Sequence, residues 1–94
     1  MILFTVRETA EFLGVCTETL RRRESRGTYP KARRDPNNYR VYTLPDLVRL
    51  YRATYGALDR PAVTDLAAML VEGRGVPAEK AAALIREAAR ALID

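Results

Sequence analysis

The feature that most constrains the fold is a pair of short helical segments that meet at Gly14. Thr5 precedes the first segment and Glu8 follows three residues later, which is the spacing of a capping box. An apolar face follows, so we expect a helix over residues 6–13. Gly14 can adopt the left-handed conformation that ends this helix, and a second helix begins near Thr17. Two short helices joined by a tight glycine-containing turn form a helix-turn-helix.

Positive charge is concentrated in the first part of the chain. Residues 1–56 contain 11 Lys and Arg and 6 Asp and Glu, whereas residues 57–94 contain 5 and 6. The net charge of +4 therefore belongs to the first part alone. Such an excess can become affinity for DNA through phosphate neutralisation and counterion release. A solvated, solubilising surface is the alternative interpretation, and the helix-turn-helix context favours DNA.

The second helix would place its outward face in the major groove. Leu20 is its buried anchor, and at about 100° per residue Arg22 projects most directly outward, so Arg22 is the first candidate for a base contact. Arg21 and Thr17 would touch a base edge or a flanking phosphate. Glu18 either accepts from cytosine N4 or compensates the positive end of the helix dipole. The candidate residues of this recognition helix are Thr17, Glu18, Arg21, Arg22 and Ser25.

Residues 32–43 are expected to form a β-hairpin. The sequence Asp35-Pro36-Asn37-Asn38 is typical of a turn, and residues 39–42 alternate as a strand does. This hairpin would be a wing whose arginines lie along the DNA backbone or reach the minor groove. Tyr39 and Tyr42 either pack in the core or donate a hydroxyl to phosphate, a role that suits Tyr39 better. The wing candidates are Arg33, Arg34, Tyr39 and Arg40, and the candidates for flanking phosphate contacts are Arg23, Arg26 and Lys31.

A third helix should follow the wing. Thr43 is its cap, Pro45 stands in its first turn, and Asp46 adds negative charge at its positive end. Leu47 and Leu50, with Tyr51, would form its inward face.

Taken together, these motifs resemble the DNA-binding domain of MerR-like regulators. The resemblance covers about residues 4–52 and includes the helix-turn-helix, the wing signature Tyr39-Arg40-Val41-Tyr42 and the helix that begins with Asp46-Leu47. Small excisionase-type winged-helix proteins are also similar. Family membership would imply DNA contacts by Arg21, Arg22, Arg34, Tyr39 and Arg40. Arg23 departs from the family pattern, where an aromatic residue is usual.

Residues 57–94 are expected to form a C-terminal helical hairpin. Pro61 opens one helix, the sequence Gly73-Arg74-Gly75 breaks it, and Pro77 opens another. The expected inner residues are Val63, Leu66, Ala67, Leu70 and Val71 in the first helix and Ala81, Leu84, Ile85, Ala88 and Leu92 in the second. Either the winged domain or a second copy of the chain must cover these faces, and their alanine-rich surface favours homodimerisation. The expected fold is mostly α with a small β-hairpin wing: a winged helix-turn-helix over residues 1–56 followed by this hairpin.

Several classes of function lack their chemical signatures in this sequence. The chain has no histidine and one cysteine, so we expect neither a disulfide framework nor a metal site, and no cofactor. We expect no enzymatic activity, since no glycine-rich phosphate loop, nucleophile elbow or paired carboxylates are present. No stretch approaches the roughly 20 apolar residues of a membrane span. We therefore expect a cytoplasmic, nucleoid-associated protein with no membrane partner and no small-molecule effector.

The sequence thus predicts a protein that binds double-stranded DNA with sequence specificity. The first hypothesis is a small MerR-like transcription regulator bound to its operator as a homodimer. An alternative is an excisionase-like or other architectural accessory factor for recombination or phage DNA transactions. In a third hypothesis the chain is a protein-interaction adaptor, which would show no preference for a DNA sequence.

Overall fold

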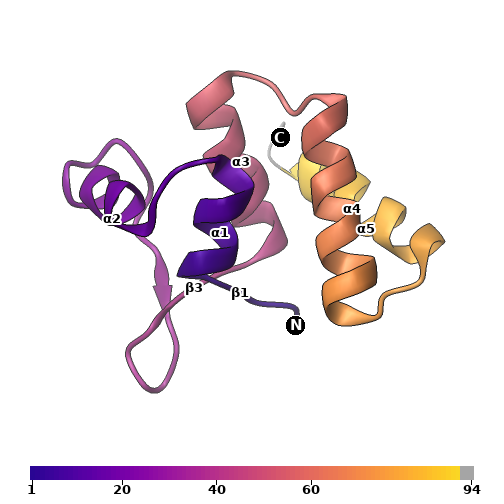
Figure 1. Cartoon of the computed structure of the whole chain (residues 1–94), viewed down its shortest axis with the longest axis horizontal. Coiled ribbons are helices and arrows are strands. Elements are labelled where there is room, and N and C mark those ends of the chain that lie inside the picture. The colour runs from indigo at the N-terminus through magenta and orange to yellow at the C-terminus, as the bar shows by residue number, and fades with distance from the viewer. Residues whose placement is uncertain (92–94) are drawn as a thin grey trace.

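The computed structural model describes residues 1–91, in which helices pack beside a small antiparallel sheet whose hairpin projects from the edge of the molecule (Figure 1). The described helices are α1 (Val6–Leu13), α2 (Thr17–Ser25), α3 (Leu44–Tyr55), α4 (Arg60–Arg74) and α5 (Ala78–Ala91), and the strands are β1 (Phe4–Thr5), β2 (Arg33–Arg34) and β3 (Arg40–Tyr42). The expected fold class, a winged helix-turn-helix followed by C-terminal helices, is confirmed. No helix within residues 1–91 has the length and apolar character needed to cross a membrane.

The sheet joins the wing to the start of the chain. Its strand order is β1-β3-β2, with Phe4 opposite Tyr42 and Arg34 opposite Arg40. Strand β1 was not predicted, because two residues before a helix cap carry too little alternation to indicate a strand. By pairing with β3, it fixes the wing against the N-terminal end of α1.

Capping boxes set the starts of α1 and α3. The Thr5 hydroxyl accepts from the Glu8 N–H at 3.1 Å, and the Glu8 carboxylate accepts from the Thr5 N–H at 2.9 Å. Thr43 and Asp46 form the same reciprocal pair at the start of α3. Each cap contributes about 1 kcal/mol by satisfying amides that have no partner inside the helix. Both predicted helix starts are therefore confirmed.

The turn between α1 and α2 depends on Gly14. Its φ of 72° lies in the left-handed region, and its N–H caps the last carbonyls of α1. An added β-carbon would stand 3.4 Å from the Tyr55 hydroxyl, which itself donates to the Leu13 carbonyl. Cys16 is the N-cap of α2, but its side chain makes no capping hydrogen bond.

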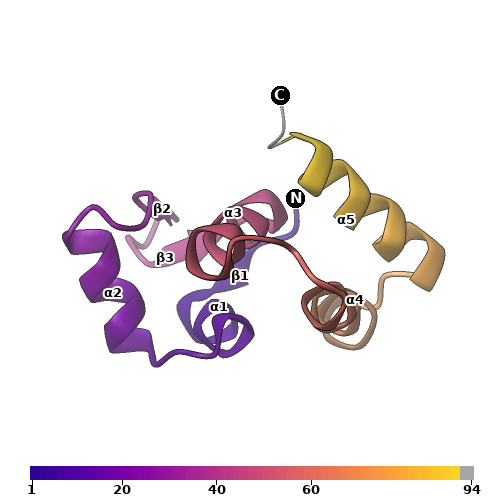
Figure 2. The same cartoon turned by 90° about the horizontal axis from the view of Figure 1, so that it is seen from above.

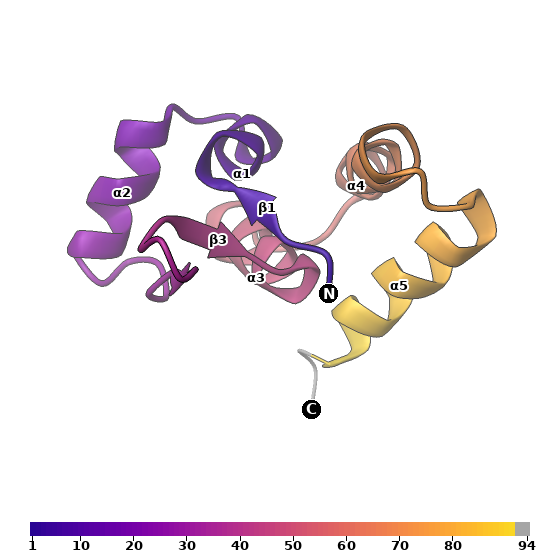
Figure 3. The same cartoon turned by 90° about the horizontal axis from the view of Figure 1, so that it is seen from below.

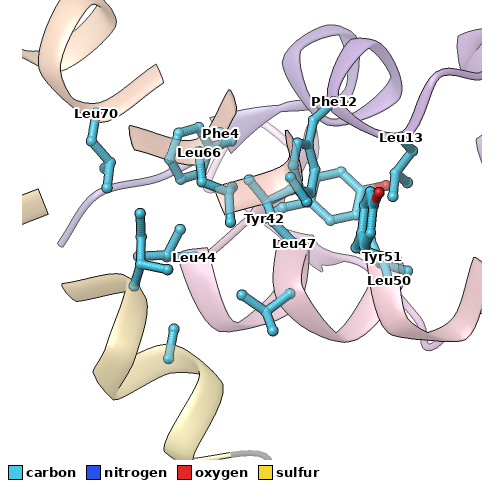
Figure 4. Packing of buried hydrophobic residues seen from close by; sticks show 14 of the residues in the cluster. Phe4, Phe12, Leu13, Tyr42, Leu44, Leu47, Leu50, Tyr51, Leu66 and Leu70 are labelled. Atoms are coloured by element: carbon cyan, nitrogen blue, oxygen red, sulfur yellow. The ribbon is translucent and has the colours of Figure 1, made fainter. Parts of the chain in front are cut away.

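One hydrophobic core runs through both parts of the chain (Figure 4). Phe4, Leu13 and Leu47 from the winged part are at most 1% exposed, and Leu66 and Leu70 of α4 are fully buried in the same cluster. The inner faces of α4 and α5 are thus covered within the chain by the winged part. This is one of the two possibilities that the sequence left open, the other being a second copy of the chain.

The inner face of α4 differs from the predicted one. Its buried row is Ala62, Leu66 and Leu70, whereas Val63 and Val71 are each 37% exposed, so the prediction for these two valines was wrong. Residues at i, i+4 and i+8 beginning at Ala62 lie on one face of α4, and this face packs into the core. In α5 the predicted Ala81, Ile85 and Ala88 are buried and Leu84 is partly buried, and Leu92 lies outside the described residues.

The two C-terminal helices cross steeply. Figure 2 shows α4 nearly end-on while α5 runs across the view, so the two helices of the expected C-terminal hairpin are present and run in different directions. Helix α5 also packs on α3. This second contact binds the C-terminal helices to the winged part.

Candidate nucleic-acid interface

The predicted recognition helix α2 lies at one end of the molecule. In Figures 2 and 3, α1 and α3 separate α2 from α4 and α5. Leu20 anchors α2 and is 1% exposed, whereas the outward candidates Glu18, Arg21, Arg22 and Ser25 are exposed. Thr17 is half-buried. The face of α2 that was predicted to point outward is therefore exposed in the structure.

Arg23 lies on the inner side of α2. Its guanidinium donates to the Tyr29 hydroxyl at 2.7 Å and stands 5.4 Å from the centre of the Tyr29 ring. Tyr29 is 3% exposed, and its hydroxyl also bonds to Thr54 of α3. Arg23, expected at a flanking phosphate, thus links α2 to the core, while Arg26 and Lys31 of the same predicted group are exposed.

Glu24 connects α2 to the wing. Its carboxylate accepts from the Arg40 Nε at 2.7 Å and from the Ala32 N–H at 3.0 Å. Both charged side chains are largely shielded, with 9% of Glu24 and 22% of Arg40 exposed. Burial opposes ionisation of Glu24, but the hydrogen bonds from Arg40 and Ala32 outweigh it and lower the pKa of this carboxyl. One carboxylate thereby holds both strands of the wing beside the recognition helix.

A second ion pair connects the wing to α3. Arg33 Nε lies 2.9 Å from the Asp46 carboxylate, which also caps the helix at Thr43. Burial raises the pKa of Asp46, but the Thr43 N–H and Arg33 more than compensate and leave the pKa lowered. The Arg33 side chain is 58% exposed, so it can hold Asp46 and still face solvent.

The wing turn is closed by its own side chains. The Asp35 carboxylate accepts from the Asn37 and Tyr39 N–H groups at 2.9 Å each. Asn38 has a positive φ of 66°, which asparagine tolerates at tight turns. Arg34 donates to the Asn38 carbonyl at 3.1 Å. The turn therefore holds its shape through hydrogen bonds within residues 34–39.

The two wing tyrosines occupy different environments. Tyr42 is 3% exposed, and burial with the nearby Glu24 raises its pKa to about 12. Tyr39 is 68% exposed at the tip of the wing. Core packing therefore describes Tyr42, and the Tyr39 hydroxyl is available to an external acceptor.

Arg21 and the wing border a common hollow of about 540 Å³. Arg21 of α2 and Arg34, Asp35, Tyr39 and Arg40 of the wing line this α2–wing hollow, together with Thr5 and Val6. The lining thus holds three guanidinium groups and a phenol beside a single carboxylate, Asp35, and the guanidinium groups and the phenol are suited to phosphate oxygens. Arg22 is exposed, and its Nη2 lies 3.4 Å from the Thr19 hydroxyl. Arg22, Ser25, Arg26 and Lys31 are not among the residues that line the hollow.

Glu24 and Asp46 were not predicted as part of the site. They position the wing arginines Arg40 and Arg33 but do not lie on the surface of the site themselves. The sequence offered one signal, the place of Glu24 near the inner face of α2, but its partners stand 8 and 16 residues away. Within residues 1–91, no group of three or more His, Cys, Asp or Glu side chains is arranged to hold a metal ion.

Comparison with known proteins places this interface in a family. The profile described as "MerR HTH family regulatory protein" matches residues 4–55, which comprise α1, α2, the wing and α3. The type II methyltransferase M.Eco47II of Escherichia coli is 40% identical over 52 residues, which are 55% of this chain and 12% of that enzyme. The chain therefore spans a small part of the relative's length, and no solved structure matches it. Because the profile covers more than half of the sequence and the whole winged helix-turn-helix, the chain belongs to the MerR HTH family of DNA-binding regulatory proteins.

Proposed function

We propose that this protein binds double-stranded DNA with sequence specificity and occupies its operator as a homodimeric transcription regulator. The observation that carries the proposal is the α2–wing hollow, where Arg21, Arg34 and Tyr39 converge beside the exposed face of α2. Membership of the MerR HTH family supports the same ligand.

In the proposed complex, α2 lies in the major groove and the wing follows the adjacent backbone. Arg22 reads a guanine through its two parallel N–H donors, and Ser25 and Glu18 stand on the same exposed face. Arg21 and Arg34 neutralise phosphates that enter the α2–wing hollow. Base contacts thus come from the helix, and register comes from the wing.

A homodimer would place two α2 helices in successive major grooves, about 34 Å apart on B-form DNA. The inner row of α4 is used within the chain, so the contact between copies would use an outer surface. Val63 and Val71 on the outer side of α4 are the exposed apolar residues that suit this contact. We propose the dimer on this basis and on the symmetry common to helix-turn-helix regulators.

The match to a type II methyltransferase shows that a segment similar to this chain also occurs in a larger protein. The chain spans 12% of that enzyme, so the match gives no reason to propose methyl transfer here. We propose no enzymatic activity for this chain and no cofactor.

The proposal is tested by selecting bound fragments from random DNA with the full chain and then titrating the winner and a scrambled duplex at two salt concentrations. We expect an inverted repeat and a preference of about 10³ or more for the winner. Sedimentation of the complex should show two chains per duplex. Equal, steeply salt-dependent binding to both duplexes would contradict the proposal and would match the architectural alternative instead.

A further inference from the structure

A second concave surface lies between α1 and α4. Its volume is about 580 Å³, and it lies on the far side of α1 from α2, as Figures 2 and 3 show for the two helices. The profile match ends at residue 55, so the α4 side of this groove lies outside the region shared with the family. We define the α1–α4 groove by its lining residues Glu8, Glu11, Phe12, Asp65, Ala68, Met69, Glu72 and Gly73.

The groove has an apolar floor and an acidic rim. Phe12 from α1 and the half-buried Ala68 and Met69 from α4 supply the floor. Carboxylates stand on both sides: Glu11 on α1, and Asp65 and Glu72 on α4, all exposed. A mixed lining of this kind suits a ligand that is both apolar and charged.

The rim carboxylates are free to meet an external cation. Glu8 is already engaged, because Arg74 donates to it at 2.9 Å and Glu8 also caps α1. Within residues 1–91, by contrast, no ion pair or hydrogen bond engages the side chains of Glu11, Asp65 or Glu72. Three negative charges therefore surround the floor in a protein whose net charge is +4.

DNA does not suit this surface. Phosphates are repelled by carboxylates, so a duplex bound at α2 and the wing would leave the α1–α4 groove uncovered. A second copy of the chain would have to offer a basic segment with apolar residues between the charges. The chain's most basic segment, residues 21–40, is the one that the DNA proposal uses.

We propose that the α1–α4 groove docks a short basic, amphipathic segment of a partner protein. Apolar side chains of that segment rest on Phe12 and Met69, while its lysines or arginines face Glu11, Asp65 and Glu72. Charge complementarity argues for this occupant, and the groove's distance from α2 allows partner and DNA to be held at the same time. The inference goes beyond DNA binding and does not depend on which operator the protein recognises.

The probe is a synthetic peptide of two repeats of Lys-Leu-Ala-Lys-Ala-Leu-Lys, titrated into the isotope-labelled full chain without DNA. We expect its binding to shift the amide signals of Phe12, Ala68, Met69 and Gly73. The triple variant Glu11→Gln, Asp65→Asn, Glu72→Gln should weaken binding about tenfold or more. The double variant Glu79→Gln, Glu87→Gln is the matched control, since these exposed carboxylates of α5 are not among the groove's lining residues, and it should bind as the parent does.

Three results would overturn the proposal. Equal weakening in the triple and double variants would show only general attraction to acidic surface. Equal binding of a peptide with every lysine replaced by glutamate would remove the electrostatic argument. Concentration-dependent shifts of the groove amides in the protein alone, abolished by the triple variant, would assign the groove to a second copy. Thermal unfolding of each variant confirms that it is folded, and DNA titration of the same samples tests the operator proposal separately.

Discussion

Glu24 shows how one largely shielded carboxylate can position the proposed DNA-binding surface without forming part of it. Leaving such a group unpaired costs about 1–3 kcal/mol or more, so its bonds to Arg40 and the Ala32 N–H stabilise one particular placement of the wing. Arg40 was predicted to contact DNA, and its Nε is committed to Glu24. Glu24 should strengthen DNA binding by positioning the wing and weaken it by its negative charge. Because the two effects have opposite signs, a substitution can tell them apart.

We predict that Glu24→Gln destabilises the fold by about 1–3 kcal/mol, because the amide loses the charge-assisted bond to Arg40. It should also weaken DNA binding, since the wing is no longer fixed to α2. Charge alone predicts the reverse, because removing a negative group beside the interface strengthens attraction to phosphate. Urea unfolding and anisotropy titrations measure the two effects, and tighter DNA binding by the variant would refute the positioning role.

Among the elements, those with local signals could be predicted from the sequence. Helices α1 and α3 begin at capping boxes whose partners stand three residues apart, so the sequence alone contains the information. In α4 the predicted Leu66 and Leu70 are buried, but Val63 and Val71 were misassigned because neighbouring rows of this helix are both apolar, and the tertiary partner decides which row is buried. The steep crossing of α4 and α5 depends on side-chain fit, which periodicity does not report.

Leu66 and Val63 test this correction directly. We predict that Leu66→Ala lowers the free energy of unfolding by about 2–5 kcal/mol, because Leu66 is fully buried in the core shared with the winged part. Val63→Ala should cost less than about 1 kcal/mol, because that valine is 37% exposed. Chemical denaturation followed by circular dichroism measures both. Similar losses of unfolding free energy in the two variants would support the predicted inner face of α4, which includes Val63.

Among the candidate interface residues, some lie on the expected surface and others bind partners within the fold. Arg21, Arg34 and Tyr39 were candidates and the structure brings them to one hollow, since their outward positions follow from helix and strand periodicity. Arg40 was a candidate as well and lines the same hollow, although its Nε binds Glu24. Arg23 was also a candidate, but its guanidinium binds Tyr29 within the fold. Charge indicates that an arginine favours anions, and it does not indicate whether the anion is phosphate or a nearby carboxylate.

At the scale of the whole molecule, ion pairs of three carboxylates within residues 1–91 connect separate elements. Glu8 binds Arg74 at the end of α4, Glu24 binds the wing, and Asp46 binds both Arg33 and the start of α3. The hydrogen bond from Arg74 lowers the pKa of Glu8, and the pKa values of Glu24 and Asp46 are lowered despite their burial. The assembly of helices, wing and C-terminal segment is therefore linked to the protonation of these groups.

Stability should consequently fall in acid. A carboxyl whose folded pKa is depressed contributes stability that is present above its unfolded pKa, which is 4.5 for Glu8 and Glu24 and 3.8 for Asp46, and loses it as the pH falls through the folded value. We predict a constant free energy of unfolding from about pH 7 to about pH 5.5 and a decline below that range. Urea unfolding across this range measures it, with Glu24→Gln as the comparison that should decline less. Equal declines would show that Glu24 does not contribute.

The central claim is that α2 reads bases while the wing holds the backbone, and the affinities of Arg22→Ala and Arg34→Ala for the selected and scrambled duplexes test it most directly. Arg22→Ala should lose about 1–3 kcal/mol on the selected duplex and much less on the scrambled one. Arg34→Ala should weaken both alike and reduce the slope of log affinity against log salt by about 1. Identical losses on the two duplexes for Arg22→Ala would contradict the claim.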